Sequence, residues 1–466
     1  MVLRRWIGDR QFYKRVLTVS VPIMIQSGIT NFVSLLDNIM VGRLGTEAMS
    51  GVSIVNQFIF IFNLLIFGAV SAAGIFTAQY HGLGDTEGVR ATFRFKFLIN
   101  LLAASLCVIA FTVFDDELIS MFLHTSEATG DVAMTLAEGK NYLSVMLFGL
   151  IPYAISQVYA STMRETEHTV VPMVASVVAV LTNLVLNAIL IFGMLGAPAL
   201  GVKGAAIATV ISRFAELGVL LVWGYTHTKD YEFLVRAFRS FRLPRALSGQ
   251  ILLKGLPLMA NELFWALAMT LRNQCYSTRG LDVVAGQNIS STIVNVFNVF
   301  YMAIGSAIAI IVGSLLGAGK LEEARDTDRK MMAFSVGCSV LMGGLLIAFS
   351  TLFPRLYNTD AHVRELATYM IIVSAILMPL NAFAHSAYFT LRSGGKVLVT
   401  LLFDSVFMWT VVLPISFALS RFTDVSIYWL FALCQGCELI KIIFGAILLR
   451  RGTWVRQLVA DEKLKQ

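Results

Sequence analysis

The chain has 466 residues, of which 57% are hydrophobic and only 14% are charged, with a formal net charge of +7. Soluble domains carry about 25% charged residues. This chain therefore lacks the ionic surface that a soluble enzyme, a nucleic-acid-binding domain or a disordered scaffold requires. Its five cysteines lie in or beside apolar stretches, which argues against a disulfide framework. The composition predicts a membrane protein.

Twelve apolar stretches are long enough to cross a bilayer, which requires about 20 residues each. Their centres lie at about residues 29, 65, 103, 146, 181, 213, 264, 300, 341, 377, 408 and 438. Several contain proline, glycine, asparagine or aspartate, as helices that line a cavity do. None alternates in the way that an outer-membrane barrel strand does. We expect an all-α membrane protein with twelve transmembrane helices.

The lysines and arginines predict the orientation of these helices. Placing both termini in the cytoplasm puts most of the 36 basic residues inside, including Arg90, Arg94 and Lys96 between the second and third spans. The acidic segment 115–117 then lies outside. We expect a multi-pass protein of the plasma (inner) membrane with both termini cytoplasmic. Because topology accounts for the positive charge, we expect the lipid bilayer and no nucleic acid as a partner.

The second half of the chain repeats the first. With a shift of 235 residues, residues 21–90 align with residues 256–325 without a gap. Pro22 falls on Pro257, and a G-x-G-x-x-E-x-x-R motif occurs at residues 82–90 and again at 317–325. The identical polar residues are the stronger evidence for the repeat, because leucines coincide by chance in any two apolar helices. Parallel repeats of this kind build transporters in which two halves move around a central cleft.

The repeat divides the chain into an N-terminal lobe of six helices (residues 1–228), a cytoplasmic linker (229–250) and a C-terminal lobe of six helices (251–466). We expect the two pseudo-symmetric lobes to surround a central cleft. The arginines of the linker recur every three or four positions, which predicts a short amphipathic interfacial helix. We expect the chain to be a monomer.

Three segments resemble the multidrug and toxic compound extrusion (MATE) family. They are residues 21–45, the stretch from Arg164 to Pro172 that continues to Asn187, and the glycine- and alanine-rich residues 196–209. The resemblance covers nearly the whole chain. It implies a secondary antiporter, not an enzyme, that exports small amphipathic, mostly cationic drugs in exchange for Na+ or H+. It implies no cofactor besides that coupling ion.

Asp37 is the first candidate functional residue, because an ionisable group within a span is costly and marks function by default. No basic residue precedes it within a helical turn. Asn183 and Asn187 are four residues apart and therefore share one face of the fifth span. By resemblance, Asp37, Asn183, Asn187 and Thr209 match the family's cation site, with Na+ as the one metal expected. Some relatives have Asp in place of Asn187, which leaves Na+ and H+ both open.

The alternative is a structural role, in which Asn183, Asn187 and Thr209 form hydrogen bonds between helices. Two pairs spaced i, i+3 are read as structural ion pairs: Arg213 with Glu216, and Glu438 with Lys441.

The C-terminal lobe departs from the repeat. Arg272 occupies the position of Asp37, and a buried charge requires a partner, for which Asp404 on the eleventh span is the candidate. Glu262 either binds a cationic substrate or lies near the inner interface. Asn381 stands where some relatives have Asp, so we expect coupling through the N-terminal lobe. These four C-lobe residues are candidates for the substrate cleft, together with Gln57, Gln157 and Gln287.

Two other functions compete with the antiporter. A lipid-linked oligosaccharide flippase of the same superfamily would need many basic residues in its cleft, and only Arg272 and Arg213 qualify. An intramembrane enzyme would need clustered histidine, aspartate or serine at catalytic spacing, whereas this chain has isolated groups.

Overall fold

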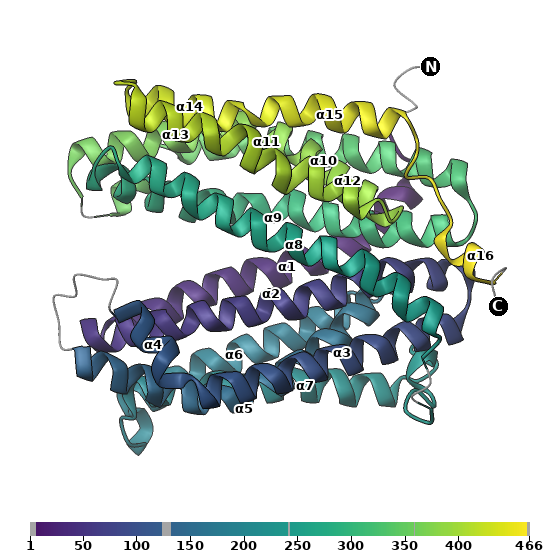
Figure 1. Cartoon of the computed structure of the whole chain (residues 1–466), viewed down its shortest axis with the longest axis horizontal. Coiled ribbons are helices and arrows are strands. Elements are labelled where there is room, and N and C mark those ends of the chain that lie inside the picture. Colours follow the sequence, from purple (N-terminus) through teal and green to yellow (C-terminus); the bar gives the residue numbers. More distant parts are fainter. Residues whose placement is uncertain (1–5, 124–131, 241–242, 358, 464–466) are drawn as a thin grey trace. The chain divides into compact units, whose positions relative to one another are not determined.

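The computed structural model describes residues 6–123, 132–240, 243–357 and 359–463, and within these ranges the chain is helical without any strand. Twelve helical segments of this part are long and apolar enough to cross a membrane. Their number agrees with the prediction from the sequence. Figure 1 shows the long helices running roughly side by side within each half.

The helices of the first half are α1 (Arg10–Gly42), α2 (Thr46–Leu83), α3 (Thr86–Val113), α4 (Asp115–Leu123), α5 (Val132–Glu165), α6 (Val170–Phe192) and α7 (Gly201–Thr226), with 3-10 turns η2 (Met194–Gly196) and η3 (Glu232–Leu234). The second half begins with α8 (Arg245–Ser277), α9 (Leu281–Gly317), α10 (Leu321–Phe349), η4 (Phe353–Leu356) and α11 (Ala361–Ser393).

The last two spans are interrupted. One consists of α12 (Val397–Leu401), the π-helical turns η5 (Leu402–Val406) and η6 (Met408–Val412), and α13 (Leu413–Phe422). The other consists of α14 (Ile427–Gly436) and α15 (Glu438–Arg450), and the short α16 (Leu458–Lys463) follows it.

The repeated glycine motif ends a helix in both halves. Gly84 follows α2 with φ of 74°, and Gly319 follows α9 with φ of 73°, a left-handed conformation that side chains with a Cβ rarely adopt. In each half the next helix then begins and forms an ion pair in its first turns, Glu87 with Arg90 and Glu322 with Arg325. The motif is therefore a helix stop followed by a helix start.

The described chain divides into two compact units. One contains residues 25–77 and 85–251, and the other contains residues up to 24, residues 78–84 and residues from 252 onward. The helices α1 and α2 therefore each contribute to both units. The lobe boundaries expected at residues 228 and 251 stay a prediction.

The linker does not form the predicted amphipathic helix where it is described. It consists of η3 and further turns up to residue 240, and α8 begins at Arg245. The buried Arg94 of α3 donates through Nε to the Ala237 carbonyl at 2.6 Å, and Arg90 donates to the Phe233 carbonyl at 3.3 Å. These bonds hold the backbone in turns, including a left-handed Arg236 with φ of 61°, instead of a continuous helix.

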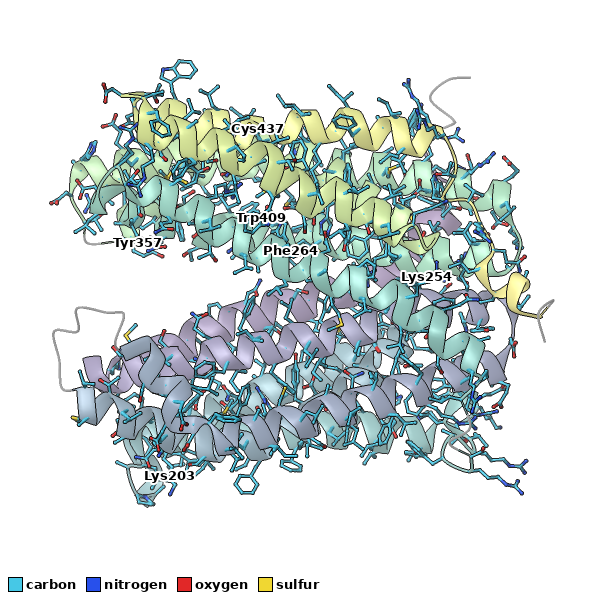
Figure 2. All side chains as sticks on the ribbon, in the orientation of Figure 1. Lys203, Lys254, Phe264, Tyr357, Trp409 and Cys437 are labelled. Atoms are coloured by element: carbon cyan, nitrogen blue, oxygen red, sulfur yellow. The ribbon has the colours of Figure 1, made fainter. Side chains whose placement is uncertain are left out.

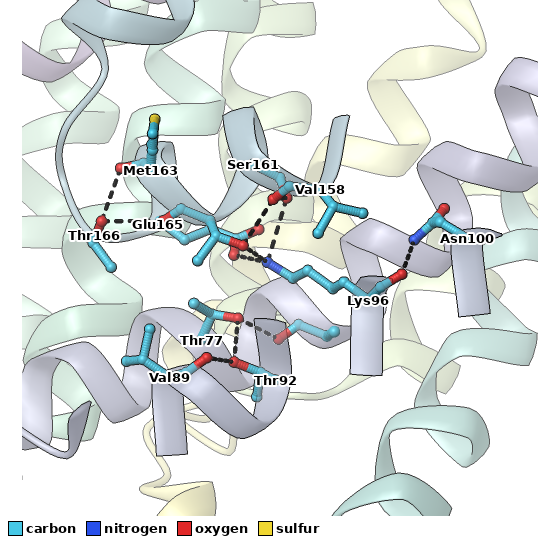
Figure 3. A network of polar contacts seen from close by, with 12 residues as sticks. Thr77, Val89, Thr92, Lys96, Asn100, Val158, Ser161, Met163, Glu165 and Thr166 are labelled. Atoms are coloured by element: carbon cyan, nitrogen blue, oxygen red, sulfur yellow. Dashed lines mark hydrogen bonds and ion pairs between the residues drawn. The ribbon is translucent and has the colours of Figure 1, made fainter. Parts of the chain in front are cut away.

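A buried ion pair joins α3 to the C-terminal end of α5. Lys96, which is fully buried, forms an ion pair with Glu165 and donates to Thr162 Oγ1 at 3.2 Å. Figure 3 shows the ammonium group pointing into this cluster of oxygens. Helix α2 contributes Gly74, where a Cβ would lie 2.2 Å from a Glu165 carboxylate oxygen, so the glycine leaves room for the carboxylate. The sequence predicts a cytoplasmic segment between two spans for Lys96, whereas in the structure this residue lies in the packed helix α3.

We predict that Lys96→Met destabilises the protein by about 3 kcal/mol, because it leaves the Glu165 carboxylate unpaired in a buried site. Thermal unfolding of the purified protein in detergent measures the effect. The double variant Lys96→Met/Glu165→Gln should recover a large part of the loss. Lys140→Met is the control, because Lys140 pairs with Asp116 at the exposed surface and should leave the melting temperature unchanged. Equal melting temperatures for wild type and Lys96→Met would contradict the prediction.

Candidate functional site

The close approach of α6 and α7 brings the predicted polar residues of the first half together. A Cβ on Gly204 of α7 would lie 2.5 Å from the Leu190 carbonyl oxygen of α6, so only glycine permits this approach. Five residues further along α7, Thr209 lies opposite Asn183. The Asn183 Nδ2 atom donates to Thr209 Oγ1 at 3.2 Å.

Asp37 of α1 completes this group. Asn187 donates through Nδ2 to the Asp37 Oδ1 atom at 2.7 Å and to Asn183 Oδ1 at 3.1 Å. Rotating the Asn183 amide by half a turn places its nitrogen 2.9 and 3.0 Å from the two Asp37 carboxylate oxygens, while its oxygen then accepts from Thr209 at 3.2 Å. All four residues that the sequence proposed for the cation site therefore lie in one hydrogen-bonded cluster.

The chemistry of the cluster suits a small cation or a proton. It offers carboxylate, amide and hydroxyl oxygens, which are the hard donors that Na+ prefers. Asn183 and Asn187 are buried, and the Asn187 Oδ1 atom accepts no hydrogen bond from the part of the chain that the structure describes. Among the described side chains, the hydrogen-bond partners of Asp37 are the amides of Asn187 and, once rotated, of Asn183. No ion pair to Asp37 occurs among the side chains that the structure describes, so its described partners are neutral amides.

A second hydrogen-bonded chain lies in the same unit, and the sequence reading missed it. Gln26 of α1 donates to Ser176 Oγ at 2.7 Å, and Ser176 donates to the Glu216 carboxylate at 3.1 Å. Arg164 of α5 donates to the Gln26 side-chain oxygen at 3.4 Å. The spacing gave a signal: Gln26 precedes Asp37 by three helical turns, so both lie on one stripe of α1.

The pairing expected between Arg213 and Glu216 is not found among the ion pairs of the described residues. Glu216 accepts from Ser176, and the Arg213 guanidinium lies over the Tyr153 ring, 4.9 Å from its centre. Glycine at position 149 of α5 provides space for Arg213, since a Cβ there would lie 3.1 Å from the arginine Cδ atom. An arginine thus packs against an aromatic ring where an intrahelical ion pair was expected.

The second half contains an ionic cluster with different partners from those expected. Asp404 of η5 pairs with Lys441 of α15 and accepts from Asn261 at 3.2 Å. Lys441 also lies 3.7 Å from Glu438, which confirms that predicted pair. The expected pairing of Arg272 with Asp404 is therefore wrong. Arg272 is buried near Tyr276, and its Nε atom has no hydrogen-bond partner among the described residues.

Asp404 lies in the first of two consecutive π-helical turns, η5 and η6. In the second of these turns, Trp409 donates to the Phe264 carbonyl at 2.9 Å and fixes the segment against α8; both residues are labelled in Figure 2. Asn261 accepts from the Ser405 hydroxyl at 2.8 Å in the same region. Such π-helical turns often occur at functional positions.

The remaining candidates for the cleft do not gather at one point in the described structure. Glu262 accepts from Tyr388 at 3.3 Å beside the Asp404 cluster. Gln287 donates to Asn273 at 2.7 Å. Gln57 is exposed on α2, whereas Gln157 of α5 and Asn381 of α11 are half-buried. Their assignment to a substrate cleft stays a prediction.

Comparison with known proteins places the chain in a family. The MatE family model matches residues 22–189 and 257–418. The two matches begin at Pro22 and Pro257, which the internal repeat had already aligned.

Among curated proteins, the chain is 25% identical over 419 residues to a probable multidrug resistance protein NorM of Thermotoga maritima, covering 89% of this chain and 87% of the relative. It is also 25% identical over 426 residues to the multidrug resistance protein PmpM of Pseudomonas aeruginosa, covering 90% and 86% of the two chains.

Two solved structures have the same fold. One is the outward-facing conformation of a multidrug resistance MATE family transporter, with a TM-score of 0.85, 18% identity and coverage of 96% of this chain and 98% of that chain. The other is the Vibrio cholerae MATE transporter VcmN in the bent form, with a TM-score of 0.83, 18% identity and coverage of 95% and 97%. Since the family model spans well over half of the chain, the protein belongs to the MatE family.

Proposed function

We propose that this protein is a secondary active efflux antiporter, which exports amphipathic organic cations in exchange for Na+ or H+ and couples the two fluxes through Asp37. The names of its relatives support multidrug efflux. We further propose that it resides in the plasma (inner) membrane as a monomer with both termini in the cytoplasm, since that orientation keeps most basic residues inside.

One observation carries the coupling proposal. Asp37 is a carboxylate within a long apolar helix, and its described polar partner is an amide instead of a cation. A bare carboxylate in a membrane is expensive, and loading it with a proton or Na+ removes the charge. Binding of a proton or Na+ to Asp37 therefore changes the free energy of the conformation in which α1 is packed.

Antiport follows if the ion and the organic cation compete for this site. A ligand shifts a conformational equilibrium only by its difference in affinity for the two states. We propose that the ion binds Asp37 from outside and releases the substrate there. After the two halves rearrange, the ion leaves on the inside and a new substrate binds.

We predict that efflux of ethidium from proteoliposomes follows either an imposed Na+ gradient or an imposed proton gradient, and that Asp37→Asn abolishes the gradient-driven part. The amide keeps the size of the side chain but neither binds a proton nor balances a cation. Asp328→Asn is the matched control, because Asp328 is another buried carboxylate and accepts from Thr390 of α11. Efflux should persist in this control. Gradient-driven efflux that survives in folded Asp37→Asn would exclude coupling through Asp37.

We also predict that Asn187→Leu raises the ion concentration for half-maximal efflux about tenfold or more, because the substitution removes a hydrogen bond to a charged group and an amide oxygen ligand. Initial rates at varied Na+ or pH give this value. Thr182→Val is the control on the same helix, since Thr182 bonds to the backbone of its own helix at Val178. An unchanged ion dependence in Asn187→Leu would remove Asn187 from the site.

A further inference from the structure

The end of α2 and the end of α9 meet in a reciprocal backbone contact. A Cβ on Gly82 would lie 1.8 Å from the Ser314 carbonyl oxygen, and a Cβ on Gly317 would lie 1.9 Å from the Gln79 carbonyl oxygen. The internal repeat aligns Gly82 with Gly317 and Gln79 with Ser314. Gly82 contacts Ser314, and Gly317 contacts Gln79, so each contact is the repeat equivalent of the other. The contact is therefore reciprocal, as in a two-fold symmetric interface.

Small residues extend this contact by one helical turn. Ala78 precedes Gly82 by four residues, and Gly313 precedes Gly317 by four. A Cβ on Gly313 would lie 3.1 Å from the Ala78 methyl group. Small residues spaced in this way allow two membrane helices to approach closely. We call the contact of residues 78–82 with residues 313–317 the α2–α9 crossing.

The segment that follows α15 binds both helices of the crossing. The Gln79 side chain is fully buried, donates to the Arg456 carbonyl at 3.4 Å and accepts from the Leu458 amide at 2.7 Å. Gln457 donates to the Gly317 carbonyl at 2.6 Å, which is the last carbonyl of α9. One short segment, residues 452–463, thus ties the end of α2 to the end of α9.

The segment packs against the end of α11 and the turn that follows it. Trp454 is buried in the core that α9 and α11 share, and its carbonyl oxygen would lie 1.9 Å from a Cβ on Gly394. Gln79 also donates to the Ser393 carbonyl at 3.1 Å. Lys254, labelled in Figure 2, donates to the Gly395 carbonyl at 3.1 Å, beside Leu458 of the segment.

The first half has no matching arrangement in the part that the structure describes. The segment after α7 also passes beside the repeated arginine, because Arg90 donates to the Phe233 carbonyl just as Arg325 lies beside Gly452. That first segment packs on α3 through Phe93 and Phe233, whose ring centres are 5.4 Å apart. Within the described residues, the bridge across the crossing is formed by the segment that follows α15.

We propose that residues 452–463 are a latch on the α2–α9 crossing, and that the latch must release before this end of the transporter can open. The inference rests on the proposed transport function, since a transporter built from two parallel repeats opens alternately at its two ends. Gln79 and Gln457 are then positioning residues of the transport cycle. They stabilise the closed crossing and do not bind the substrate or the ion.

Thiol accessibility tests the latch without a drug or an ion gradient. Ser314→Cys, in a background where the five native cysteines are replaced by alanine, places a buried thiol at the crossing. In inside-out vesicles, a membrane-impermeant maleimide should label this thiol slowly. Adding Gln79→Leu and Gln457→Leu should raise the labelling rate about tenfold or more, because the latch loses its side-chain hydrogen bonds while its apolar packing remains. Gln435→Leu, on α14, is the control and should leave the rate unchanged.

A cross-link provides the converse measurement and leaves the hydrogen-bonded backbone in place. The double variant Gln79→Cys/Gln457→Cys is made in the same cysteine-free background, and its two thiols are joined by a reducible bifunctional reagent. The cross-linked protein should bind ethidium with unchanged affinity but transport none. Reduction should restore efflux.

Two results would overturn the proposal: an unchanged labelling rate in the folded double leucine variant, or full efflux by the cross-linked protein. If ethidium is not a substrate of this protein, the labelling experiment still decides the latch. Failure of the proposed antiport and failure of the latch are therefore distinguishable.

Discussion

The hydrocarbon interior of a bilayer offers no hydrogen-bond partner, and this constraint governs the whole molecule. Every backbone amide must be satisfied within its own segment, so the spans are helices. Helices in lipid gain little from burying apolar surface, and they associate by close packing and by a few polar contacts. Gly204 against Leu190, and Gly82 against Ser314, are the resulting points of closest approach. Each fixes the register in which nearby polar side chains meet.

The two halves use that register for different chemistry. The first half leaves the Asp37 carboxylate with amide partners, whereas in the second half Asp404 forms an ion pair with Lys441. At the position that the repeat aligns with Asp37, the second half has Arg272. Duplication therefore preserved the helical framework and its glycine contacts, while the charges inside it changed.

Features encoded by local periodicity could be predicted from the sequence. The twelve spans follow from runs of apolar residues, and the shared face of Asn183 and Asn187 follows from a spacing of four. The grouping of Asp37 with Asn183, Asn187 and Thr209 came from the family resemblance. Partners on different helices could not be derived from periodicity, because they depend on how far each helix is rotated about its axis. For that reason Arg272 was assigned to Asp404, although Lys441 lies there. The linker escaped prediction because Arg94, far away in the chain, holds its backbone in turns.

The ion pair between Lys96 and Glu165 has a consequence for biogenesis. The two residues are 69 positions apart, so Lys96 enters the membrane before its partner has been synthesised. Until then its long side chain can extend toward the lipid headgroups and keep its charge in water. When α5 arrives, the ammonium group exchanges that solvation for the Glu165 carboxylate and turns inward. The ion pair that joins α3 to α5 can therefore form only after α5 has been synthesised.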